Sequence, residues 1–362
     1  MTSYDVIVHL SLIHGVGPAS IKQIIDSFAQ MSDLVCLYTM HTSDLMHRCG
    51  LTETIAHLVV QGLKDARSFE QERLLLERHA IHTVTVLHDT YPTLLQSIYV
   101  PPAVLYYKGT LPTESDTLVA IVGARKATSY GLDAVKMLVP SLVHHGVTIV
   151  SGGALGIDQY AHDQAIKSGG KTIAVLGSGL LRLYPASNRR LFDVIVQSGG
   201  ALISPFPLRM EAMPGHFPAR NRIIAGLSHG TVVVQAAKKS GALITARYAL
   251  EQGRELCAVP GPINAELSHG CHDLIKEGAV LVSQAEDILQ AIALPVLSRN
   301  TESTIRSNQT SDSLLEACVE PLSVDELVSK TGLSLEELHS RLFQLQLNGV
   351  IEQDFMGCWR RI

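Results

Sequence analysis

The sequence predicts an α/β fold built on a doubly wound, mostly parallel, Rossmann-like sheet. Its central stretch is Leu118–Gly123 (LVAIVG), an apolar run without polar alternation that leads into a glycine. Such a run is typical of a strand buried on both faces. The pattern recurs where Val147–Val150 enters Ser151–Gly153, and where Thr172–Leu176 enters Gly177–Gly179. Small-residue turns of an open α/β sheet gather at the carboxyl edge of the strands, where ligands bind.

The region before this core reads as a helical domain over residues 1–70. Leu10–Ile25 contains a glycine turn followed by an amphipathic segment, as in helix-hairpin-helix or SAM-like domains. A plain helical hairpin with a glycine turn explains the same pattern, and both interpretations stay open.

The central domain is expected to occupy residues 71–294, with alternating strands and helices after a first, proline-flanked piece of sheet. This alternation indicates a doubly wound architecture. The predicted strands outside the three core runs are Ile81–Leu87, Val104–Gly109, Ala201–Ser204, Thr231–Val234, Glu255–Val259 and Ala279–Val282. The predicted helices include Ala161–Ser168, Arg189–Gln197, Arg220–Leu227 and Ala242–Gln252.

The C-terminal part divides into a polar linker over 295–312 and a small winged-helix domain over 313–362. Ser323 and Ser334 are followed three residues later by Glu326 and Glu337, the spacing of two capping boxes. Val350–Gln353 and Cys358–Arg360 are expected to form the wing. The domain holds 4 lysines and arginines against 8 acidic residues. We therefore expect it to contact protein rather than to read duplex DNA.

The chain has no uncharged apolar run of about 18 or more residues, and MTSYDVIVHL holds an early Asp and no basic region, so we expect no membrane span and no secretory signal. The six cysteines form no CxxC pair, which favours reduced thiols in the cytoplasm. The net charge is −5, yet residues 118–262 hold 15 lysines and arginines against 7 acidic residues. A basic middle between acidic flanks suggests an anionic partner at the centre, although charges solvated all round the domain would give the same count.

Common cofactor and catalytic motifs are missing from the sequence. Gly123-Ala124-Arg125 is not GxGxxG, and there is no Walker motif, no HExxH and no GxSxG. Asp158 and His162 have the spacing of a metal pair on a helix, but we expect Asp158 to be a helix N-cap. We predict no cofactor, no metal and no catalytic residues.

Two basic features stand out. Arg125 directly follows the first core strand, so its side chain is expected over the carboxyl edge. His216–Arg222 (HFPARNR) places arginines at the start of a predicted helix, where the helix dipole favours anions instead. A bound phosphate would relieve that conflict, as would carboxylates elsewhere in the fold.

Seven segments resemble the DNA-processing protein family DprA, also called Smf. They are AIVGAR, SGGALGIDQYAH, TIAVLGSGL, YPASNRRL, HFPARNRIIAGLS, SGALITARYALEQGRELCAVPG and GCHDLIKEGA, in order between Ala120 and Ala279. The resemblance implies a non-enzymatic single-stranded-DNA-binding protein of natural transformation and recombination. It also implies a homodimer formed through the central domain, and a protein that protects incoming DNA and helps to load the RecA recombinase.

The resemblance, together with the basic residues near the turns, gives a set of expected DNA-binding residues. These are Gly123, Arg125, Lys126, Ser151, Gly152, Lys171, Gly177, Gly179, Phe217, Arg220, Asn221, Arg222, Lys238, Ser240 and Gly241. Arg182 is expected to add charge to the groove, and Phe217 to offer a stacking surface for bases. Ala124, Leu155 and Ala242 depart from the family pattern, which commonly has serine, arginine and serine there.

Two other function classes are alternatives to a DNA-binding protein. A nucleotide or nucleoside-monophosphate hydrolase on a related Rossmann-like domain would carry PGGxGTxxE, whereas Ser240–Ala246 (SGALITA) lacks its glutamate. A scaffold protein with a vestigial pocket has only the acidic overall balance in its favour.

Overall fold

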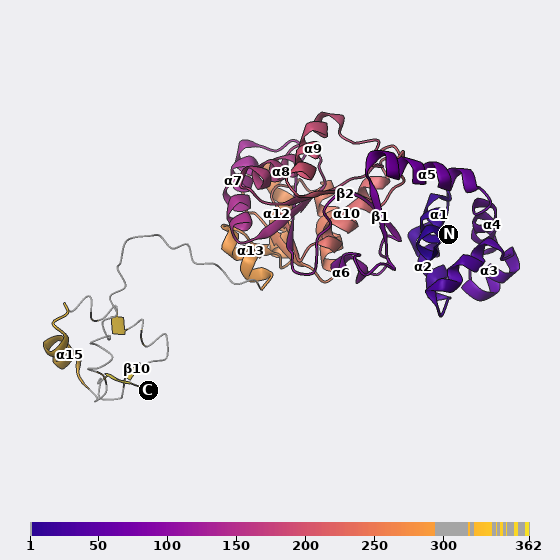
Figure 1. The fold of residues 1–362 in the computed structure, drawn as a ribbon. Helices are drawn as coiled ribbons and strands as arrows, with labels where there is room; N and C mark the ends of the chain where they lie inside the picture. Colours follow the sequence, from indigo (N-terminus) through magenta and orange to yellow (C-terminus); the bar gives the residue numbers. More distant parts are fainter. Residues whose placement is uncertain are drawn as a thin grey trace. The chain divides into compact units, whose positions relative to one another are not determined.

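The computed structural model describes residues 2–293 and parts of the C-terminal region: 318, 322–334, 338, 341–342, 345, 351–353 and 359–361. The chain divides into two compact units, Met1–Leu297 and Ser298–Ile362 (Figure 1). The helices predicted for residues 1–70 therefore belong to the same compact unit as the sheet. The predicted linker 295–312 lies outside the described residues.

A nine-stranded sheet forms the centre of the first unit, with the strand order β1-β2-β6-β5-β4-β3-β7-β8-β9. The strands from β6 to β9 in that order are parallel, whereas β1 and β2 run antiparallel at one end. The strands are β1 His82–Thr85, β2 Val104–Gly109, β3 Thr117–Val122, β4 Val147–Ser151, β5 Thr172–Val175, β6 Ala201–Ser204, β7 Gly230–Val233, β8 Glu255–Ala258 and β9 Val280–Leu281. The predicted α/β class and the predicted strand positions are confirmed.

Helices cover both faces of the sheet, which explains the apolar strands. Val119 and Ile121 of β3 face one core with α7, α8 and α13, while Leu118, Ala120 and Val122 face the other with α10, α11 and α12. The helices of this region are α6 Thr93–Gln96, α7 Ser129–His144, α8 Ile157–Lys167, α9 Arg189–Gln197, α10 His216–Leu227, α11 Gly241–Glu251, α12 His269–Lys276 and α13 Ala285–Ala291, with short 3-10 turns η2 Ala186–Asn188 and η3 Glu266–Ser268.

The N-terminal part consists of α1 Ser3–Leu12, α2 Pro18–Asp26, η1 Met31–Tyr38, α3 Thr42–Cys49, α4 Glu53–Gly62 and α5 Ala66–His79. A turn with Gly15 at φ 88° joins α1 to α2, as the glycine pattern predicted. Glu72 of α5 ties these helices to the central region, because its buried carboxylate accepts a hydrogen bond of 2.7 Å from the Leu208 N–H.

The second unit contains α15 Val324–Thr331 and a hairpin of β10 Ile351–Gln353 with β11 Trp359–Arg361. The capping box at Ser323 is present, with its hydroxyl and N–H bonded to Glu326. Trp359 packs with Leu327 and Leu338 in a small core. Glu337 and most of the expected second helix at 335–347 lie outside the described residues. The described elements agree with the predicted wing.

Candidate nucleic-acid interface

The sheet changes direction of winding between β3 and β7, which creates a crevice at their carboxyl ends. β4, β5 and β6 follow on one side of β3, and β7, β8 and β9 lie on the other. Ligands of doubly wound folds bind at such a switch point. A cavity of about 600 Å³ lies there, lined by the residues that follow β3 and β7 and by Glu266, Leu267 and His269.

Positive charge dominates this crevice. Arg125 and Lys126 follow β3, while Lys238 and Lys239 follow β7, and all four side chains are exposed. Glu266 is the acidic residue of the lining. In residues 2–293 none of these four cations forms an ion pair. The crevice therefore presents cations that an anionic ligand can neutralise.

An aromatic pair extends the crevice on the other side of Arg125. The Arg125 Cζ lies 5.2 Å from the centre of the Phe217 ring, within the range of a cation–π contact. The Phe217 ring centre is 5.7 Å from that of Tyr184, with the planes inclined by 52°. Phe217 also lies over Gly177, where an added Cβ would come within 3.0 Å of the ring. Guanidinium and aromatic groups thus follow one another along the carboxyl edge.

Arg220 is placed differently from the sequence-based expectation. Only 4% of it is exposed, and its guanidinium donates to the carbonyls of Gly152 and Val175, at the ends of β4 and β5. Burial lowers the pKa of Arg220 to about 10, with nearby Asp158 opposing this and nearby Arg125 adding to it. Its donors are therefore used inside the protein. We assign Arg220 to holding the strand ends beneath Arg125 and correct the expectation that it lines the groove.

Asp158 and His162 lie buried below the same edge. The N-cap of α8 is Gly156, not Asp158 as expected; the Asp158 carboxylate instead accepts from the Gly152 N–H at 3.1 Å. Burial raises the pKa of Asp158, while Arg220 counteracts that rise. The His162 Nδ1 is 2.7 Å from the Thr172 hydroxyl, and its Nε2 has no partner. Within the described ranges no group of three or more potential metal-ligating residues occurs.

The small residues expected to cradle phosphate are packed against the chain's own atoms. A Cβ at Gly123 would meet Ile157, one at Gly152 would meet the Arg220 guanidinium, and one at Gly179 would meet the Pro207 carbonyl. Ser151 is fully buried and donates its hydroxyl to the Ile121 carbonyl. These residues allow close packing at the strand ends, so we assign them to shaping the edge.

Three other expected residues lie where α10 meets the start of α11. Asn221 accepts from Arg220 Nε at 3.1 Å and donates to the Gly241 carbonyl at 3.3 Å. Ser240 caps α11 and lines the 600 Å³ cavity. Gly241 faces open space at the start of α11. The positive end of the α11 dipole therefore adds to the potential of the crevice.

Burial lowers the pKa of Arg222, which lies close to Tyr248 and Tyr91.

Lys171 does not share the carboxyl edge, because it precedes β5 and lines a cavity at the amino ends of the strands with Asp116. We correct its assignment to the groove. Lys239 was missed, although its place beside Lys238 after a buried strand was a usable signal.

The comparisons with known proteins agree with this architecture. Residues 82–293 match the family model described as DNA recombination-mediator protein A, and residues 311–354 match the DprA winged helix domain. Protein Smf from Escherichia coli is 38% identical over 294 residues, covering 79% of each chain. DNA processing protein DprA from Streptococcus pneumoniae is 45% identical over 205 residues, covering 57% of this chain and 72% of its own.

Two solved structures are similar in fold and sequence. DprA from Streptococcus pneumoniae aligns with a TM-score of 0.68 at 35% identity, covering 80% of this chain and 98% of its own. DNA processing protein A from Helicobacter pylori, a protein that binds single-stranded DNA, aligns with a TM-score of 0.52 at 29% identity, covering 59% of this chain and 95% of its own. Along the described stretches, no helix has the length and apolar content needed to cross a membrane.

Proposed function

Since this chain belongs to the DNA recombination-mediator protein A family, also named DprA or Smf, we propose that it binds single-stranded DNA at the crevice between β3 and β7. The observation that carries the proposal is the placement of Arg125, between a cavity with three lysines and the Phe217 ring. Single strands present both phosphates and unstacked bases, which is what cations beside an aromatic face accommodate.

The proposed role of each side chain follows from its exposure to solvent. Arg125, Lys126, Lys238 and Lys239 approach phosphates, whereas Phe217 and Tyr184 offer faces on which bases stack irrespective of sequence. The buried guanidinium of Arg220 keeps the ends of β4 and β5 in place beneath them. This work involves no bond cleavage, so we propose a binding protein rather than an enzyme.

A role in natural transformation and in RecA loading is proposed from the family. We infer that the protein covers incoming single strands in the cytoplasm during natural transformation and helps the RecA recombinase to assemble on them. We also infer that it acts as a homodimer through the central domain. Support comes from the match to a recombination-mediator family and from relatives named as DNA processing proteins.

The test of binding is fluorescence anisotropy with labelled oligo-dT. We expect salt-sensitive binding of the full chain, weakened about tenfold or more by Arg125→Ala. Arg247→Ala is the matched control, because Arg247 is exposed and paired with Glu251 on its own helix. Absent binding, or binding that Arg125→Ala leaves unchanged, would overturn the proposal.

RecA loading is tested by the RecA ATPase activity on single strands precoated with a single-strand-binding protein. The wild-type chain should shorten the delay before this activity reaches its steady rate, and the Arg125→Ala variant should not. Sedimentation of the full chain tests the dimer. A chain that binds DNA but leaves this delay unchanged would remove the mediator role and leave the binding role standing.

A further inference from the structure

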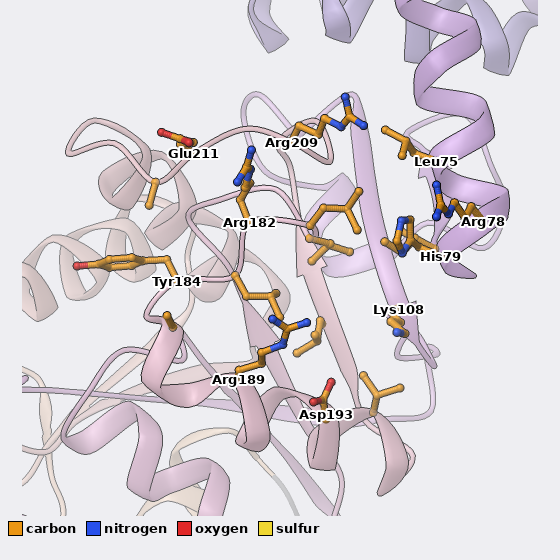
Figure 2. A pocket seen from close by; sticks show the side chains of 18 of the residues that line it. Leu75, Arg78, His79, Lys108, Arg182, Tyr184, Arg189, Asp193, Arg209 and Glu211 are labelled. Atoms are coloured by element: carbon orange, nitrogen blue, oxygen red, sulfur yellow. The ribbon is translucent and has the colours of Figure 1, made fainter.

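A second, larger basic cavity lies between α5, β2, α9 and the loops that follow β5 and β6 (Figure 2). Its volume is about 1180 Å³, above the 300–1,000 Å³ or so of a typical small-molecule pocket. Five lysines and arginines line it, together with His79: Arg78, Lys108, Arg182, Arg189 and Arg209. Asp193 and Glu211 are the acidic residues of the lining.

The five cations come from separate walls that the fold holds together. Arg78 projects from α5, Lys108 from β2, and Arg189 from the start of α9 (Figure 2). The loops that carry Arg182 and Arg209 are joined by two backbone hydrogen bonds, from the Gly179 N–H to the Met210 carbonyl at 2.8 Å and from the Leu181 N–H to the Leu208 carbonyl at 2.9 Å. Residues distant in sequence are thus fixed around one space.

The buried carboxylate of Glu72 adds a further attachment. It accepts the Leu208 N–H at 2.7 Å and so fastens the Arg209 loop to α5. The loop position therefore depends on a contact between the N-terminal helices and the central region. This contact makes the cavity a feature of the whole 2–293 unit.

The cavity keeps an excess of positive charge, since five lysines and arginines face Asp193 and Glu211 in the lining and Glu72 interacts electrostatically with Arg209 alone among them. Across residues 2–293, none of its five lysines and arginines forms an ion pair with a carboxylate. Arg189 and Arg190 also occupy the first turn of α9, where the helix dipole disfavours cations. A phosphate near Arg189 would neutralise the unpaired cations and would also interact favourably with the positive end of the α9 dipole.

Tyr184 connects this cavity to the crevice. Its side chain is 48% exposed and lines the larger cavity, while its ring centre lies 5.7 Å from that of Phe217. Phe217 in turn lies against Arg125. The Phe217–Tyr184 pair therefore connects Arg125 of the crevice to the lining of the larger cavity.

We propose that this cavity is a second binding segment for the same single strand, which passes over Phe217 and Tyr184 and places further phosphates among Arg182, Arg189 and Arg209. The inference rests on the proposed function of the crevice. A polymer fits better than a mononucleotide, because the cations are spread over several walls of a cavity larger than one nucleotide needs. The occupant is thus a phosphodiester strand rather than a free phosphate.

The test compares oligo-dT of about 6 and about 20 nucleotides, since only the longer strand can fill both segments. The double variant Arg189→Ala/Arg209→Ala should weaken binding of the long strand about tenfold and leave binding of the short strand within about twofold. Each lost phosphate contact makes the negative slope of log K against log salt shallower by about 0.7. For the long strand, the magnitude of the slope should therefore be smaller by about 1.4 in the double variant than in wild type.

The control double variant is Arg73→Ala/Arg247→Ala, which removes the same formal charge. Both arginines are paired with carboxylates on their own helices, so both strand lengths should bind as to wild type. Thermal unfolding of each variant checks that the unit is intact.

The outcomes separate the two proposals. The second segment alone would be overturned if Arg189→Ala/Arg209→Ala weakened the binding of short and long strands equally. It would also be overturned if this double variant bound the long strand as wild type does while Arg125→Ala still weakened binding. Binding of pyrophosphate to the cavity, competitive with the long strand only, would support it through the shared phosphate chemistry. Loss of the length effect together with insensitivity to Arg125→Ala would overturn the proposed function as well.

Discussion

The guanidinium of Arg220 occupies the space that a Cβ at Gly152 would require, so the two residues fit only as a pair. The arginine donates to the carbonyls of Gly152 and Val175, and the Gly152 N–H donates to Asp158. The carboxyl ends of β4 and β5 are thereby fixed by a buried charge, and exposed Arg125 lies close above them. Arg220 of the HFPARNR motif thus differs in role from Arg125.

Replacement of Arg220 by alanine should destabilise the protein rather than remove a DNA contact. Removing the guanidinium leaves the buried carbonyls of Gly152 and Val175 without their charged donor, and hydrogen bonds of charged groups typically contribute about 1.5–3 kcal/mol each. We expect that loss in the free energy of unfolding of the first unit, measured by urea denaturation. Arg247→Ala should change it by less than about 1 kcal/mol, because its ion pair is exposed. An Arg220→Ala protein as stable as wild type but defective in DNA binding would contradict the assignment.

Phe217 should act through its aromatic face. Phe217→Ala should weaken oligo-dT binding by about 1–3 kcal/mol, the usual value for one stacked base. Phe217→Trp should retain binding, and the fluorescence of the new indole should be quenched by DNA. The native tryptophan, Trp359, packs in the core of the second unit and provides an internal reference. Equal affinity of the alanine and tryptophan variants would argue against stacking.

His162 should make stability fall in acid. Burial, with a smaller effect from Arg220, lowers the pKa of His162 to about 3, whereas the unfolded chain has the ordinary value of 6.5. Between pH 6.5 and pH 3, His162 is protonated in the unfolded state but neutral in the folded state. The free energy of unfolding is therefore unaffected by His162 above pH 6.5 and falls as the pH decreases towards 3. The slope should approach about 1.4 kcal/mol per pH unit.

The matched variant is His162→Asn, whose amide can still donate to the Thr172 hydroxyl. Urea denaturation at pH 7 and pH 5 should show a smaller loss of stability for this variant than for wild type. The raised pKa of Asp158 acts in the opposite sense in both proteins, because the folded state then binds its proton first. Identical pH profiles would exclude His162 as the source of the acid sensitivity.

Much of the fold follows from local sequence patterns. Runs such as LVAIV at 118–122 leave few alternatives to a strand covered on both faces, and α9 has the predicted bounds, Arg189–Gln197. Arg125 directly follows a strand, so its place at the carboxyl edge was also predictable. The strand order, by contrast, depends on crossovers that no local pattern specifies.

The direction of single side chains was harder to predict. Arg220 shares the helical face of Ile223, Ile224 and Leu227, and that periodicity rather than its charge decided its burial. Lys171 was grouped with the crevice by charge although it precedes its strand. The cavity of Figure 2 depends on α5 packing beside β2 and β6, a long-range arrangement to which the sequence offers no local guide.

The most direct test of the account is the salt dependence of oligo-dT binding by wild type, Arg125→Ala and Lys238→Ala. A strand held by phosphates at the crevice predicts a linear fall of log K with log salt, with the slope reduced by about 0.7 in each variant and the affinity lowered at every salt concentration. A wild-type slope near zero, or slopes that neither substitution changes, would contradict the central claim that cations at the ends of β3 and β7 hold the strand.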